Sequence, residues 1–119
     1  MAPRTLFEVP DGRGKLVRVY EPSWRHVLKG HPELAGEEEA VRLTISDPDM
    51  VIRPSNRPKG RNIDRRVNVR LGPHSRYNEL YVVVPIDYSR EESWLVTAFV
   101  SAQTPKGDLL FVRVPFRWS

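Results

Sequence analysis

Apolar and polar positions alternate near the amino end of the chain and predict a β-hairpin over residues 5–20. The runs TLFEV and KLVRVY are rich in residues typical of strands, and the sequence PDGRG between them favours a turn. We therefore expect the chain to begin with two paired strands.

The spacing of apolar residues becomes helical in the next segment, EPSWRHVLKG. Three apolar residues fall on one face of such a helix: Trp24, Val27 and Leu28. Ser23 is expected to cap this helix, and Gly30 is suited to end it in the left-handed conformation. Pro32 and the acidic Glu33 then favour the start of a second helical segment.

The run EEEAVRLTIS continues as an amphipathic helix, which the sequence DPD ends. Its expected buried face is Ala40, Val41, Leu43, Thr44 and Ile45. The carboxylates at residues 37–39 suit the positive end of the helix dipole, and no second group of ligands has a matching spacing. We therefore expect no metal site and no cofactor.

The rest of the chain is typical of strands. Five segments have strand-like composition: MVIRP, RRVNVRLG, ELYVVVPID, SWLVTAFVSAQ and DLLFVRVPF. The second alternates as a half-exposed strand does, and the third is continuously apolar, as in a central strand. The pattern predicts an α+β fold with an N-terminal β-hairpin, two short helices, and then an antiparallel β-meander sheet with the helices packed on one face.

Composition narrows the class of protein. The length of 119 residues fits a single domain over residues 1–119. The chain has no cysteine, which excludes disulfides, cysteine zinc sites and thiolate catalysis. No apolar run approaches the roughly 18 residues of a membrane span, and the amino end lacks the apolar core of a signal peptide. We therefore expect a cytoplasmic protein that binds no membrane.

Positive charge is concentrated in residues 53–76. Eight of the 19 Lys and Arg residues lie there against one acid, which gives the segment a net charge of +7. This concentration is typical of proteins that bind RNA, although a solvated arginine-rich loop would have the same composition. We also expect Tyr77, which follows this segment, to bind RNA, because tyrosine rings stack on RNA bases. The predicted RNA-binding residues are Lys29, Arg57, Lys59, Arg61, Arg65, Arg66, Arg76 and Tyr77.

Two histidines in WRHVLKGHPEL, His26 and His31, form a candidate acid-base pair. In metal-independent RNA cleavage, one group removes the proton of the 2′-hydroxyl that attacks phosphorus, and another protonates the leaving oxygen. A cation, Arg70 or Arg66, would stabilise charge on the phosphate, and Thr97 would position it. The predicted catalytic residues are His26, His31, Arg70 and Thr97.

The same histidines also fit a structural interpretation. His26 would then be an exposed helix residue, and His31 would only cap the segment before Pro32. Residues five apart diverge by about 140° on a continuous helix, so the two rings converge only if the chain bends at Gly30. The third histidine, His74, is expected to be a solvated turn residue and a reserve acid-base group.

The order of these motifs resembles a known family. WRHVLKGHPEL, a helix ending in ISDPDMVI, and then ELYVVVP and WLVTAFVSA are similar to the small phage- and mobile-element-associated branch of the barnase-EndoU-colicin-RelE-like (BECR) ribonuclease toxin fold. The likeness extends from about Trp24 to Ala102. The positions that carry it are Trp24, His26, the triplet His31-Pro32-Glu33, and Thr97-Ala98-Phe99. The family's aromatic-basic pair is absent here, and VNVRLG offers Asn68 and Arg70 instead.

The resemblance implies a toxin-type endoribonuclease, a hydrolase, whose antiparallel sheet forms the floor of an RNA groove. It also implies an antitoxin or immunity protein as a second partner. Two other functions remain open from the residues alone. One is a non-catalytic RNA-binding module on the same scaffold, and the other is a protein-interaction domain whose basic loop docks an acidic partner.

Overall fold

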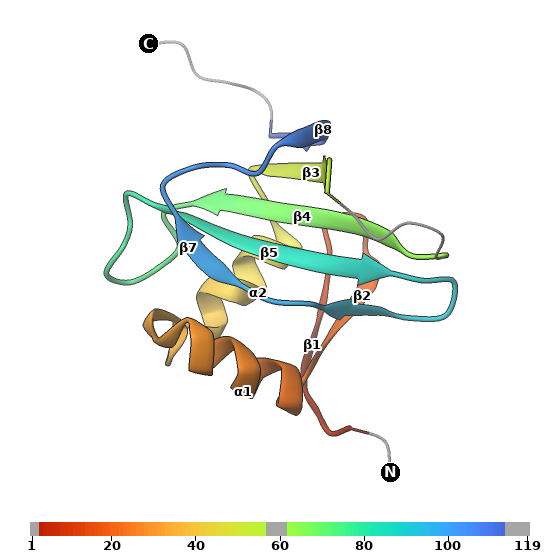
Figure 1. Cartoon of the computed structure of the whole chain (residues 1–119), viewed down its shortest axis with the longest axis horizontal. Helices are drawn as coiled ribbons and strands as arrows, with labels where there is room; N and C mark the ends of the chain where they lie inside the picture. The colour runs from red at the N-terminus through yellow and green to blue at the C-terminus, as the bar shows by residue number, and fades with distance from the viewer. Residues whose placement is uncertain (1–2, 57–61, 114–119) are drawn as a thin grey trace.

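The computed structural model describes residues 3–56 and 62–113 (Figure 1). The elements in these ranges are β1 (Thr5–Pro10), β2 (Leu16–Tyr20), α1 (Glu21–Gly30), the 3₁₀ turn η1 (Pro32–Leu34), α2 (Glu38–Ser46), β3 (Met50–Pro54), β4 (Asp64–Leu71), β5 (Tyr81–Tyr88), β6 (Ser93–Leu95), β7 (Phe99–Ser101) and β8 (Gly107–Val112). Neither α1 nor α2 is long and apolar enough to cross a membrane.

All of these strands belong to one mixed sheet with the order β1-β2-β6-β5-β4-β3-β8, and β7 also pairs with β5. The ladder between β4 and β5 is antiparallel and unbroken from Asp64↔Tyr88 to Leu71↔Tyr81. The hairpin β1–β2 joins this sheet through a short parallel pairing of β2 with β6 at Arg18↔Trp94. The central strand is therefore β5, which the continuously apolar run ELYVVVPID predicts.

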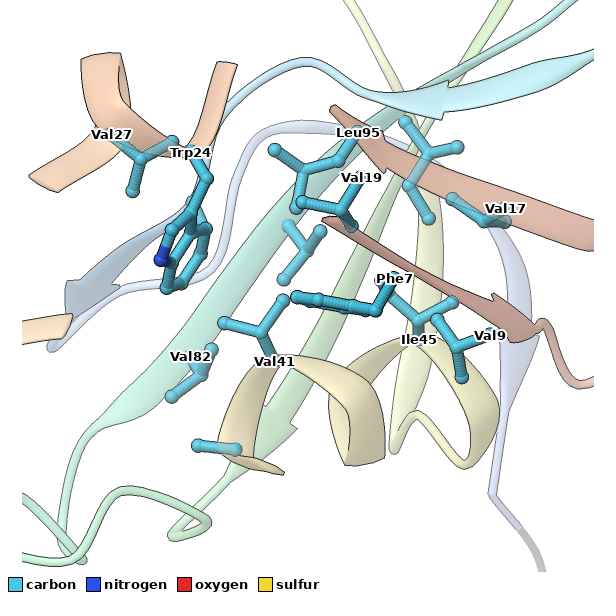
Figure 2. Close-up of a cluster of buried hydrophobic side chains, with 14 of the residues drawn as sticks. Phe7, Val9, Val17, Val19, Trp24, Val27, Val41, Ile45, Val82 and Leu95 are labelled. Carbon is cyan, nitrogen blue, oxygen red and sulfur yellow. The ribbon is translucent and has the colours of Figure 1, made fainter. Parts of the chain in front are cut away.

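The helices cover one face of the sheet, and the hairpin runs across the β4–β5 pair on the same side (Figure 1). Figure 2 shows Phe7 among side chains from both helices and from the sheet. Trp24 meets the Phe7 ring edge-on, with 6.3 Å between centroids. The buried side chains of this cluster include Val17, Val19, Val27, Val41, Ile45, Val82 and Leu95.

Alternation along β4 divides its side chains between the two faces of the sheet. Val67 and Val69 belong to a second buried cluster with Ile52 and Val83. Asn68 instead faces α2, where its amide nitrogen donates to the carbonyl oxygens of Thr44 at 3.2 Å and Ile45 at 3.1 Å. A polar residue is therefore buried within β4 because it satisfies carbonyl groups at the end of a helix.

The α+β class, the N-terminal hairpin and the two helices agree with the sequence prediction. The predicted start of α1 is wrong, and so is the conformation predicted for its last residue, Gly30. Ser23 lies inside α1, which starts at Glu21 with Pro22 in its first turn, and Gly30 does not adopt a positive φ. The helix ends at Gly30 and is capped by His31, whose φ of −137° precedes Pro32.

Leu43, predicted to be buried, is 38% exposed because Val41, Thr44 and Ile45 form the inward face of α2. The predicted strand over residues 93–103 is divided into β6 and β7, which both pair with β5. The last strand also leaves the meander order, since β8 pairs with β3. Residues 114–116 of its predicted range lie outside the described part of the chain.

Candidate functional site

His31 lies at the corner between α1 and η1. Its backbone N–H donates to the Val27 carbonyl at 2.7 Å and closes the last turn of α1. Its ring nitrogen Nδ1 lies 3.5 Å from Glu33 Oε1, and its side chain is 40% exposed. The ring packs against Phe99 at 5.7 Å between centroids. We call the group His31, Glu33 and Phe99 the histidine corner.

The histidine corner joins two motifs that lie far apart in the sequence. The triplet His31-Pro32-Glu33 meets β7, which begins at Phe99 directly after Thr97 and Ala98. Ala98 is fully buried, whereas Thr97 is half-buried. Thr97 is therefore near the corner along the chain, although no described contact joins it to His31.

His74 attaches the loop between β4 and β5 to this corner. Its Nδ1 accepts the backbone N–H groups of Arg76 at 3.0 Å and Tyr77 at 3.2 Å. Its Nε2 lies 2.6 Å from the Glu33 carbonyl oxygen, which only accepts, so Nε2 carries the proton and donates. His74 holds the loop against η1.

The prediction that His74 is solvated is wrong, because the ring is buried. Its neighbours Gly72 and Pro73 indicate a turn, but this turn folds back onto η1 instead of projecting into solvent. Glu37 strengthens the contact by accepting the backbone N–H and the hydroxyl of Ser75. These bonds lower the pKa of Glu37, the backbone N–H having the largest effect.

Arg76 and Tyr77, both predicted to bind RNA, lie in the loop that His74 attaches. The Tyr77 ring is 4.9 Å from the His74 ring and is 41% exposed. The Arg76 guanidinium lies 5.7 Å from the Tyr77 centroid. An exposed aromatic ring and a cation therefore lie beside the histidine corner, which is the combination that binds a base and its phosphate.

His26 and Lys29 are exposed on α1. His26 lies about 160° around the helix from the buried Trp24, since each residue turns the helix by about 100°. No described contact joins His26 to the ring of His31, which packs against Phe99 at the start of β7.

Arg70 lies on the α2 side of β4 and is bound to Asp47, with 3.0 Å to Oδ2. Asp47 also accepts a bond from Arg113, and together these cations lower its pKa, Arg113 having the larger effect. Arg70 therefore joins the end of α2 to the sheet, and no described contact joins it to the histidine corner.

The two predicted RNA-binding cations of β4 that follow Asp64 are also paired with carboxylates. Arg65 donates twice to Asp87, at 2.7 and 2.9 Å, and Arg66 donates to Asp64 at 2.8 Å. Asp64 further lies 3.6 Å from Arg53. Arg57, Lys59 and Arg61 lie outside the described residues.

A second cationic group, of which only Arg66 is predicted from the sequence, surrounds Tyr88. Three cations lie near its ring centroid: Arg13 at 4.9 Å, Lys15 at 5.4 Å and Arg66 at 5.8 Å. The Tyr88 hydroxyl donates to Asp11 at 2.7 Å. The other two cations, Arg13 and Lys15, lie in DGRGK, whose composition indicates a turn and not a site. We call Asp11, Arg13, Lys15, Arg66 and Tyr88 the Tyr88 cluster.

Two hollows adjoin the Tyr88 cluster, and Arg13 and Tyr88 line both. One has a volume of about 320 Å³ and is walled partly by Val51, Leu110 and Phe111. The other has a volume of about 430 Å³ and is lined by Lys15, Asp64 and Arg90, among others. Neither hollow is lined by His26, His31 or Thr97.

Comparisons of the chain with protein-family models, with curated proteins and with solved structures find no match. Within residues 3–56 and 62–113, no three His, Asp or Glu side chains form a group that could hold a metal ion. Interpretation of the site therefore rests on its own geometry and chemistry.

Proposed function

We propose that the protein is an endoribonuclease that cleaves RNA at the histidine corner without a metal ion. The observation that carries this proposal is the packing of His31, beside the Glu33 carboxylate, on the strand that follows Thr97-Ala98. A half-exposed imidazole oriented by a carboxylate is a common arrangement for proton transfer.

The chemistry uses groups on both sides of the corner. The 2′-hydroxyl attacks the adjacent phosphorus, the bond to the 5′-oxygen breaks, and a cyclic phosphate remains on the upstream fragment. His31 removes the proton of the attacking 2′-hydroxyl, the leaving 5′-oxygen takes a proton from water, and Glu33 holds the His31 ring in orientation. Tyr77 stacks on a base, and Arg76 stabilises charge on the phosphate.

A second candidate function is RNA binding without cleavage. The observation that favours it is that, among the described contacts, no second imidazole at the corner has a ring nitrogen free for proton transfer. His26 lies on the solvent side of α1, and both ring nitrogens of His74 are bonded to backbone groups. The corner then presents the Arg76-Tyr77 pair as a stacking and phosphate site only.

Cleavage assays in chelator separate the two candidates. A labelled oligoribonucleotide and its deoxy counterpart, which lacks the 2′-hydroxyl, are incubated with the wild type and with His31→Ala. Cleavage of RNA but not of DNA, slowed about 10²- to 10⁴-fold in His31→Ala, supports the nuclease. Matched controls are Arg4→Gln and Arg25→Gln, on exposed side chains outside the corner. These two variants should cleave RNA as the wild type does.

Intact RNA at stoichiometric protein would overturn the nuclease proposal. If the intact RNA is bound, with an affinity that falls steeply with salt and is reduced in Tyr77→Ala, RNA binding is the function. If RNA is neither cleaved nor bound, both candidates are wrong. Circular dichroism of each variant separates loss of function from loss of fold.

A further inference from the structure

The Tyr88 cluster gathers positive charge at the tip of the β1–β2 hairpin. Arg13 and Lys15 come from the turn, and Arg66 comes from β4, so segments distant in sequence supply cations around one ring. Asp11 and Asp64 pair with Arg13 and Arg66 and offset part of their repulsion. Among the described residues, Lys15 donates to a carbonyl, that of Ser89, at 3.2 Å, and no carboxylate there pairs with its charge.

The two hollows beside the cluster differ in chemistry. The larger one is lined by three cations, Arg13, Lys15 and Arg90, against one carboxylate, Asp64. An anion placed there meets an excess of positive charge and several N–H donors. The smaller hollow has apolar walls at Val51, Leu110 and Phe111, and the Phe111 side chain is 47% exposed. An exposed aromatic side chain on an apolar wall favours a ligand with a planar aromatic ring, which can stack on it.

We propose that these adjoining hollows form a binding site for a nucleoside phosphate. The phosphate lies among Arg13, Lys15 and Arg90, and the base enters the smaller hollow against Phe111. Arg13 and Tyr88 line both hollows, so one ligand can reach from one into the other. The smaller hollow alone, at about 320 Å³, has the size of small-molecule pockets.

This site is separate from the histidine corner. Arg66 lies near the start of β4 and Leu71 at its end, next to the loop that His74 attaches. Five residues of strand span about 17 Å, so a ligand at Tyr88 does not occupy the proposed cleavage site. The bound group is a free nucleotide or one nucleotide of an RNA chain, and both present the same phosphate and base.

Titration with adenosine monophosphate, adenosine and inorganic phosphate tests the site. Calorimetry gives the affinities, and amide NMR shifts give the location. We expect adenosine monophosphate to shift Arg13, Lys15 and Phe111 amides while those of His31 and Tyr77 stay unchanged. The double variant Arg13→Gln/Lys15→Gln should weaken binding of both adenosine monophosphate and phosphate about 100-fold, since each charge-assisted contact is worth about tenfold. Phe111→Ala should weaken the binding of adenosine monophosphate about tenfold and leave the binding of phosphate unchanged.

The matched control for charge is Arg4→Gln/Arg25→Gln, which removes two exposed cations elsewhere. Equal weakening by this control, shifts centred on the histidine corner, or no binding of adenosine monophosphate at millimolar concentration would each overturn the proposal. An oligoribonucleotide identifies the source of the ligand. If the double variant also loses RNA affinity, the site holds a nucleotide of the chain, and if RNA affinity is unchanged, it holds a free nucleotide.

Discussion

The bond between Tyr88 and Asp11 gives a sharp test of how the hairpin is attached to the sheet. The Tyr88 hydroxyl donates to Asp11 Oδ2 at 2.7 Å, and both side chains are buried. The other oxygen, Oδ1, accepts the backbone N–H groups of Arg13 at 2.8 Å and Lys15 at 2.9 Å. In Tyr88→Phe, Asp11 Oδ2 keeps one bond among the described residues, from the Arg13 guanidinium at 3.2 Å. A buried hydrogen bond to a charged group contributes about 1.5–3 kcal/mol, so we expect the free energy of unfolding to fall by about 2 kcal/mol.

The pH dependence of this loss has a definite sign. Burial raises the pKa of Asp11, but bonds from the Tyr88 hydroxyl and from the N–H groups of Lys15 and Arg13 outweigh it, and the pKa is lowered from 3.8. A lowered carboxyl pKa contributes stability above its unfolded value, and this contribution is lost as pH falls through the folded pKa. The pKa of Tyr88 is raised mainly by burial and further by its bond to Asp11, so its hydroxyl keeps its proton and remains a donor. The cost of Tyr88→Phe should therefore be full at pH 7 and shrink below about pH 4.

Urea unfolding followed by circular dichroism measures both effects. The matched control is Tyr20→Phe, because the Tyr20 hydroxyl donates to Glu92 at 2.8 Å and the Glu92 side chain is 42% exposed. This exposed bond should contribute less than about 1 kcal/mol. Equal losses in the two variants, or a Tyr88→Phe loss that does not change between pH 7 and pH 3, would refute the reasoning.

Three further substitutions test the packing and the assignments of individual side chains. Ile45→Ala removes a fully buried side chain of α2 and should lower the free energy of unfolding by about 2–5 kcal/mol in urea titration, whereas Leu43→Ala, on the exposed side, should cost much less. Arg65→Gln leaves the buried Asp87 without its two bonds and should cost about 1–3 kcal/mol, while reducing RNA affinity less than Arg76→Gln does. His74→Ala should speed hydrogen exchange of the Arg76 and Tyr77 amides, which then lose their acceptor, and unchanged exchange would show that the ring does not hold the loop.

Elements with a clear local period could be predicted from the sequence. The alternation in residues 5–20 and the helical spacing in residues 37–46 locate β1, β2 and α2 closely. Long-range pairing has no such signal. The run SWLVTAFVSA looks like one strand, but its two halves pair with different parts of β5, Ser93 with Tyr88 and Ser101 with Tyr81. The pairing of β8 with β3 likewise depends on a register that no local pattern indicates.

The net charge of residues 53–76 does not predict which cations are available to a ligand. Arg65, Arg66 and Arg70 lie in the basic segment, but each is paired with a carboxylate. Asp87 and Asp47 come from other parts of the chain, so the net charge of residues 53–76 overstates the charge available to a ligand. Arg13 and Lys15 form no charged run in the sequence, because their neighbours include Asp11, Gly12 and Gly14. Charge summed along the sequence includes residues whose charge is paired in the fold, whereas a ligand interacts with the side chains that are close to it in space.

The attachment of the hairpin and the proposed nucleotide site depend on the same tyrosine in different ways. The hydroxyl of Tyr88 donates to Asp11, and Asp11 in turn accepts the backbone N–H groups of Arg13 and Lys15 in the turn. The ring is what the cations approach, and Tyr88→Phe retains a ring. If the turn is positioned mainly by its own backbone bonds to Asp11, the Phe variant loses stability but keeps its cations beside the ring. If the hydroxyl positions the turn, stability and cation placement are lost together. The buried carboxylate that stabilises the hairpin is then also the group that assembles the charge at its tip.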